Sequence, residues 1–149
     1  MARLTTDEFR ELSRLYYERR IEHSRTAMQL QGDYGKWLVA SLLLTHGGAF
    51  VFLAQGEEFG QRILAAIHWW LVAGLFLALI TGFVTWLNWS LHWRVFDETT
   101  SPDMIYDTER WPKDHKLDPW IDRTFYGAIV FGLLSAGCIF GAAIAAPGV

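Results

Sequence analysis

Charged side chains are absent from three long stretches of this 149-residue chain. Residues 37–54, 63–87 and 125–146 contain no Asp, Glu, Lys or Arg. At about 1.5 Å per residue, each stretch forms a helix long enough to cross a hydrocarbon core about 30 Å thick. Charge is confined to residues 1–36, 55–62 and 88–124. This segregation is typical of a membrane protein and disfavours a soluble globular core.

Cysteine and catalytic motifs are equally scarce. The chain has one cysteine, Cys138, in the third apolar stretch, so it forms no internal disulfide and contains no zinc-binding spacing. It also lacks a nucleophilic triad, a phosphate-binding glycine loop and a metalloprotease motif. Acidic and basic groups at membrane depth, which ion-coupled transporters need, are missing apart from two histidines. We therefore expect no enzyme and no nucleic-acid partner.

The composition predicts an all-α integral membrane protein. The expected segments are a cytoplasmic or interfacial N-terminal helix (1–36), a transmembrane hairpin (37–87, with spans 37–54 and 63–87), a cytoplasmic cap (88–124) and a third span (125–146). The apolar stretch begins too far from residue 1 for a signal peptide. Seven Lys and Arg residues precede the first span, one lies in the first turn and five lie in the cap. The positive-inside rule then places the N-terminus in the cytoplasm and the C-terminus in the periplasm of a bacterial inner membrane.

The N-terminal segment, residues 5–31, has the pattern of one amphipathic helix. Thr5 and Glu8 have capping-box spacing, and glutamates and arginines alternate at ion-pairing distances along the helix. Such a helix lies on the membrane with its arginines at anionic lipid headgroups, packs on the same helix of another subunit, or is solvated. Gly32 and Gly35 are expected to interrupt or bend the chain before Trp37.

Small residues recur along the apolar stretches. One every four positions lets helix backbones approach closely in lipid. These stripes pack either the three spans of one chain or the spans of neighbouring chains. The residues singled out are Gly47, Gly48, Gly74, Ala78, Gly82, Gly132, Gly137 and Gly141.

Seven of the eight tryptophans lie near the expected span ends, as an aromatic belt requires. Trp111 is the exception, and docking onto the first helix would explain it. Within the cap, Ser101-Pro102 and Asp118-Pro119 are typical of helix starts, so short ordered helices are expected there. Asn88, at the end of the second span, is a candidate intramembrane polar site.

Two short motifs resemble a group of small bacterial inner-membrane proteins that are mostly uncharacterised. The first span contains His46-Gly47-Gly48-Ala49, where the group often has Asn-Gly-Gly-Ala. The second span ends Gly82-Phe-Val-Thr-Trp-Leu-Asn88, similar to the group's Gly-Phe-x-Thr-Trp-x-Asn. The resemblance covers about half of the chain, and it implies a bacterial membrane protein without implying an activity. A fold-level analogy links the chain to compact membrane effectors of bacterial antiviral systems.

His46 and His68 are the ionisable residues inside the spans. Counted from the shared turn at 55–62, they differ in depth by only about 4–5 Å. Two neutral imidazoles at matching depth are able to ligate a haem iron or a metal, with Gly47 and Gly48 making room for a flat ring. The alternative is that each histidine hydrogen-bonds to Ser, Thr or backbone of a neighbouring helix.

Two classes of function remain from the sequence. The first is a homo-oligomeric inner-membrane protein, with a pore or channel as one form of it. The second is an accessory subunit of a larger membrane complex. Small-residue stripes serve both classes, so the oligomeric state in mild detergent is the observation that separates them.

Overall fold

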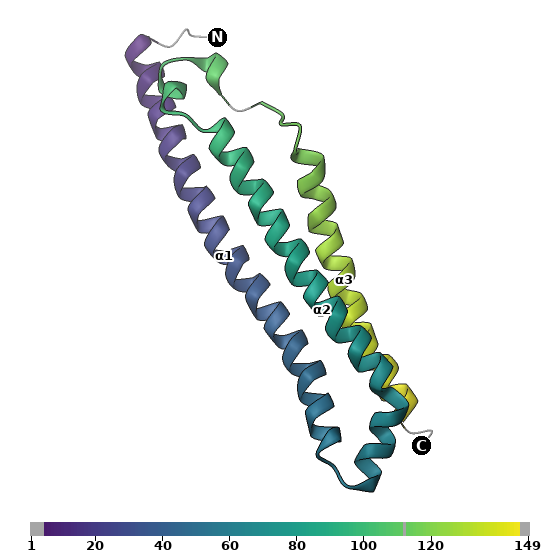
Figure 1. Cartoon of the computed structure of the whole chain (residues 1–149). Helices are drawn as coiled ribbons and strands as arrows, with labels where there is room; N and C mark the ends of the chain where they lie inside the picture. Colours follow the sequence, from purple (N-terminus) through teal and green to yellow (C-terminus); the bar gives the residue numbers. More distant parts are fainter. Residues whose placement is uncertain (1–4, 112, 147–149) are drawn as a thin grey trace.

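The computed structural model describes residues 5–111 and 113–146, which form three long helices joined by a tight turn and a short cap (Figure 1). No strand occurs in these ranges. The elements are α1 (Thr6–Ala54), α2 (Glu58–Thr99), the 3-10 helices η1 (Pro102–Ile105) and η2 (Thr108–Arg110), and α3 (Asp118–Ala145). The all-helical prediction is confirmed. Each long helix is apolar and long enough to cross a membrane.

α1 begins where the sequence predicted. The Thr5 hydroxyl accepts a hydrogen bond from the Glu8 backbone N–H, and the Glu8 carboxylate accepts one from the Thr5 N–H at 2.7 Å. This capping box satisfies two donors that the first turn would otherwise leave unpaired. The carboxylate's hydrogen bonds with Thr5 hold the pKa of Glu8 below its usual value.

The predicted interruption at Gly32 and Gly35 is wrong, because α1 continues unbroken through both residues for 49 residues. Neither glycine has a positive φ, so neither breaks the helical backbone. Gly35 instead marks a close approach, since a Cβ there would lie 3.0 Å from Thr85 Cγ2 on α2. A helix of this length spans about 73 Å, more than twice a hydrocarbon core. Residues 6–31, which we call the stalk, therefore form one continuous helix with the first apolar stretch instead of a separate helix.

α2 is also longer than its apolar stretch. It continues to Thr99, twelve residues past the expected end of the second span at Leu87. The cap is therefore shorter than expected, but it does contain the short helices. Ser101 caps η1 by accepting from the Asp103 N–H, as predicted. At the start of α3, Leu117 rather than Asp118 is the N-cap residue.

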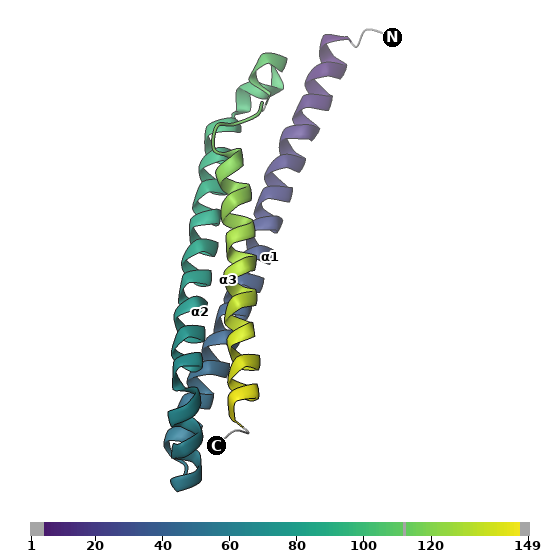
Figure 2. The same cartoon turned by 90° about the vertical axis from the view of Figure 1, so that its right-hand side faces the viewer.

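α2 is the central helix of the three. α1 and α3 both run antiparallel to α2 and pack along it, whereas α1 and α3 touch each other only sparsely. Figures 1 and 2 show the three helices side by side, with the cap and the N-terminal end of α1 at the same end. The small core at the opposite end is built from Ile67, Leu71 and Ala142. Much of the outer surface of α1 and α3 is left uncovered and apolar.

Candidate functional site

A polar layer connects the three helices near the middle of their apolar stretches. His46 on α1 is 1% exposed, and its imidazole lies directly against Gly74 on α2. On the other side of α2, the Ser135 hydroxyl of α3 donates to the Gly74 carbonyl oxygen at 2.8 Å. Both neighbouring helices therefore contact α2 at Gly74, which leaves room for the His46 ring because it has no side chain.

The hydrogen bonding of His46 shows which ring nitrogen donates. Nδ1 lies 2.8 Å from the Leu42 carbonyl oxygen, which can only accept, so Nδ1 is the donor. Nε2 finds no hydrogen-bond partner among the described residues. Because the ring is almost completely buried against Gly74, His46 does not line a water-filled path in this chain.

The structure does not bring His46 and His68 together, as a haem or metal site using this pair would require. His68 is half-buried on α2, beside residues of α1, and its Nδ1 contacts the Ala65 carbonyl oxygen at 2.8 Å. Its ring packs beside Trp69 and lines a surface depression with Phe50. The sequence indicated that the two histidines lie at similar depth, but depth does not determine which way each side chain points. Gly74, not His68, is the α2 residue that faces His46, and the two α2 positions lie on different faces of the helix. No cluster of three or more His, Cys, Asp or Glu in the described ranges could hold a metal.

Asn88 is a clamp between α2 and α3. It is buried, and its amide nitrogen donates to the Ile121 carbonyl oxygen at 2.7 Å and to the Thr124 hydroxyl at 2.8 Å. The Thr124 hydroxyl in turn lies within hydrogen-bonding distance of the Trp120 and Ile121 carbonyl oxygens. The sequence identified Asn88 as an intramembrane polar residue but gave no signal that Thr124 and Ser135 were the groups on α3 that complete these contacts.

The small residues divide into two groups. Some pack the spans of one chain, which is one of the alternatives left open by the sequence. Gly74 and Ala78 are buried, Gly82 and Gly132 contact side chains of neighbouring helices, and Gly141 lies against the Trp70 ring at 2.7 Å from an added Cβ. Others have no neighbour within 4 Å of such a Cβ, namely Gly47, Gly48 and Gly137.

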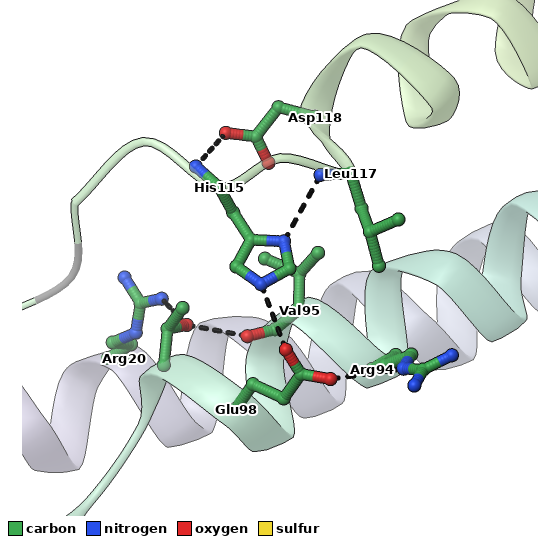
Figure 3. A network of polar contacts seen from close by, with 8 residues as sticks. Arg20, Arg94, Val95, Glu98, His115, Leu117 and Asp118 are labelled. Carbon is green, nitrogen blue, oxygen red and sulfur yellow. Dashed lines mark hydrogen bonds and ion pairs between the residues drawn. The ribbon is translucent and has the colours of Figure 1, made fainter.

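A second polar cluster ties the cap to the end of α2 (Figure 3). The Glu98 carboxylate accepts from Arg94 Nε at 3.0 Å and from His115 Nε2 at 2.9 Å. His115 Nδ1 accepts from the Leu117 N–H, and the His115 N–H donates to the Asp118 carboxylate. The hydrogen bond from Arg94, and then that from His115, hold the pKa of Glu98 below its usual value.

The stalk of α1 also docks onto the cap. Tyr16 stacks on Trp111 with ring centroids 4.8 Å apart, so the predicted docking of Trp111 onto the first helix is confirmed. Arg20 donates from Nε to the Thr100 hydroxyl and from Nη2 to the Thr99 hydroxyl, both at 3.1 Å. Sequence reasoning missed the role of Arg20, because a basic residue among seven gives no sign of its partners.

Three cavities meet at Trp89. The first, of about 440 Å³, lies between α1 and α2 and is almost wholly apolar except for Lys36. The second, of about 220 Å³, lies between the stalk and the end of α2 and includes Arg20 and His92. The third, of about 240 Å³, lies in the gap between α1 and α3 and includes Asn88. Burial lowers the pKa of His92, although Asp118 and Asp122 oppose the shift.

Comparison with known proteins adds no name: no family model, no curated protein and no solved structure matches the chain. The fold and the polar layer define only a class. In the described ranges, the chain is an all-helical protein with three helices suited to cross a membrane. Its function has to be argued from its own surfaces.

Proposed function

We propose that the chain is a bacterial inner-membrane protein whose copies assemble into a homo-oligomer through the outer faces of α1 and α3. Its N-terminus and cap lie in the cytoplasm. Three apolar helices and the basic residues of the stalk and cap support insertion in this orientation. Large apolar side chains cover the outer faces of the spans, as either lipid or a neighbouring chain requires.

The observation that carries the proposal is the position of Gly48 and Gly137. Both are exposed, and neither has a neighbour that an added side chain would meet. Glycine weakens a helix relative to alanine, so its presence on an uncovered face calls for a reason. Close approach by another helix is the reason that applies in lipid.

The two glycines also lie at matching depth. His46 and Ser135 meet the same residue, Gly74, and therefore mark one level on α1 and α3. Both helices are antiparallel to α2, so they run in the same direction. Gly48 lies two residues after His46, and Gly137 lies two residues after Ser135, so each glycine is about 3 Å further along its helix than that level. α1 of one copy can therefore pack in parallel against α3 of the next copy, glycine to glycine.

The outer face of α1 continues into the stalk. Leu12 precedes Gly48 by 36 residues, which is about ten turns at 3.6 residues per turn, so both lie on one face. Leu12 and Leu15 are about half exposed, at 51% and 50%. A neighbouring copy that covers Gly48 in the membrane would bury these leucines in the cytoplasm.

Two different surfaces of each chain meet in this arrangement, so the contact is heterologous and closes into a ring when the rotation between copies allows it. A pore, the form of assembly considered from the sequence, would then lie between copies rather than inside one chain, because His46 is buried.

The test is the oligomeric mass in mild detergent of Gly48→Leu and Gly137→Leu. Overpacking costs about 1–3 kcal/mol per contact, so each change should weaken assembly by roughly tenfold or more. Ala73→Leu, a matched change on the exposed side of α2, should keep the wild-type mass. A monomeric wild-type chain would instead favour an accessory subunit of a larger complex.

Mixing the two variants tests the heterologous geometry. The Gly48→Leu chain keeps a normal α3 face, and the Gly137→Leu chain keeps a normal α1 face. The mixture should therefore form a 1:1 heterodimer although neither variant associates alone. If the mixture stays monomeric, or if only Gly48→Leu disrupts assembly, the α1-to-α3 contact is wrong. Insertion is checked separately by resistance to carbonate extraction and by reporter fusions at Val149 and near Lys116, which should report opposite compartments.

A further inference from the structure

The apolar cavity between α1 and α2 that Trp89 and Lys36 line opens on the surface that the proposed insertion exposes to lipid. Its walls lack side-chain bulk, because Gly32, Gly35 and Ala40 on α1 and Gly82 on α2 contribute little or none. The cavity has a volume of about 440 Å³. An empty space of this kind forfeits dispersion contacts along its whole lining, so within a bilayer an apolar occupant is favoured.

The length and depth of the cavity match one leaflet. Along α1 it extends from Gly32 to Leu43, which is eleven residues or about 16 Å. This length is about half the 30 Å thickness of a hydrocarbon core, and the end at Gly32 and Lys36 lies at the headgroup level, before the first span begins at residue 37. Trp86 and Trp89 line its cytoplasmic half, at the level where tryptophans mark the membrane interface.

The charge at the cavity is positive. Lys36 is the basic residue in its lining, and its side chain is 82% exposed. Its nearest carboxylate, Asp33, lies 3.7 Å away and is itself 71% exposed, which makes a weak and easily exchanged ion pair. The ammonium group is therefore available to a phosphate at the headgroup level.

We propose that this cavity binds one anionic phospholipid of the cytoplasmic leaflet, with an acyl chain between α1 and α2 and the phosphate at Lys36. The inference rests on the proposed membrane insertion but not on the proposed oligomer interface. The groove side of α1 carries Ala40 and Leu43, whereas the proposed interface uses the face of Gly48. The lipid would complete the packing between α1 and α2 on both sides of the close contact at Gly35.

Native mass spectrometry of the full chain tests the site, with phosphatidylglycerol and phosphatidylcholine of identical acyl chains as probes. The wild-type chain should retain one phosphatidylglycerol in preference to phosphatidylcholine. Ala40→Trp fills the groove and should abolish retention, whereas Ala73→Trp, the same change on the exposed side of α2, should not. A basic residue near an anionic surface contributes about 1 kcal/mol, so Lys36→Gln should reduce the preference about five-fold. Lys113→Gln, in the cap, should leave it unchanged.

Each other outcome contradicts the proposal in a recognisable way. Unchanged retention by Ala40→Trp would show that the lipid binds elsewhere on the chain. Equal retention of the two lipids, unaffected by Lys36→Gln, would remove the phosphate contact. A change of oligomer mass in Ala40→Trp would show that a second copy fills the groove. Failure of the chain to resist carbonate extraction would overturn membrane insertion itself, which is read out independently of lipid binding.

Discussion

The contact between His46 and Gly74 gives the sharpest test of the packing of the spans. In Gly74→Ala, the new methyl group would overlap three atoms of the His46 imidazole, each closer than a real Cβ contact allows. The ring cannot move aside freely, because its Nδ1–H is bonded to the Leu42 carbonyl oxygen and the residue is buried. The substitution therefore acts on a rigid neighbour and not on the end of a flexible side chain.

The magnitude follows from three contributions. Overpacking at a rigid site lies at the upper end of its range, about 3 kcal/mol. Displacing the ring also loses a hydrogen bond worth about 1 kcal/mol. Replacing glycine with alanine inside a helix returns about 1 kcal/mol. We expect Gly74→Ala to lower the free energy of unfolding by about 3 kcal/mol.

The double variant His46→Asn/Gly74→Ala separates this contact from any general effect at position 74. Asparagine is shorter than histidine, so the methyl group at position 74 no longer meets a ring. The double variant should therefore be more stable than Gly74→Ala alone, with a coupling free energy of about 2 kcal/mol, inside the range for residues in contact. His46→Asn alone should fold and assemble, because a hydrogen-bonding side chain remains.

Reversible unfolding in mixed detergent micelles, followed by circular dichroism, measures all four members of the cycle. Gly47→Ala is the control, because a Cβ at Gly47 meets no atom within 4 Å. It should raise the free energy of unfolding by up to about 1 kcal/mol, because alanine replaces glycine inside a helix and meets no neighbour. The reasoning is refuted if Gly74→Ala matches this control, or if replacing His46 fails to rescue it.

Two further predictions concern the clamp and the cap. Asn88→Ala removes two hydrogen bonds between α2 and α3 and should cost about 1–2 kcal/mol in the same unfolding assay, since such bonds average about 0.6 kcal/mol in membranes; Ser90→Ala, whose hydroxyl bonds only to its own helix at Trp86, should cost less than about 0.5 kcal/mol. Glu98 has a folded pKa below its ordinary 4.5, so its stabilisation is present above that value and is lost as the pH falls through the folded pKa. Glu98→Gln should therefore speed hydrogen exchange at residues 115–118 at about pH 7, and the acceleration should shrink as the pH falls through the folded pKa of Glu98. An acceleration that does not change with pH would contradict a role for the carboxylate charge.

The helices were predictable to the extent that apolarity and capping chemistry define them. The charge-free stretches located all three long helices, and Thr5 with Glu8 located the start of α1. The ends facing the cap were not predictable from the apolar stretches, because α1 and α2 both continue as helices into charged sequence. A helix leaving the membrane needs no break, since water satisfies charged side chains on the same backbone. Gly32 and Gly35 were misleading for a related reason: glycine breaks helices through positive φ, whereas here Gly35 serves a close contact with Thr85.

The sequence predicted which polar residues are candidates for the site, but it did not predict which residues they contact. Charge scarcity singled out His46, His68 and Asn88, because few polar residues lie inside the spans. Their partners depend on helical phase and on which helix is central, and a hydropathy pattern carries neither. Equal depth favoured a pairing of His46 with His68, yet the residue that faces His46 is Gly74, six positions further along α2. Six residues are about one and two-thirds turns, which places the two positions on different faces of the helix.

The orientation of each glycine on its helix also separates the glycines packed within the chain from those left uncovered. The sequence alone could not make this distinction. Gly74 and Gly141 are small because His46 and Trp70 of the same chain occupy the space that their side chains would fill. Gly48 and Gly137 have no such neighbour, so the structure of one chain gives no account of why they are glycine. The large apolar side chains on the remaining outer surface need no partner other than lipid, but lipid does not account for two uncovered glycines at one depth. α1 and α3 run parallel and hardly touch each other within the chain. We therefore expect copies of the chain to contact each other at the faces of α1 and α3 that carry Gly48 and Gly137.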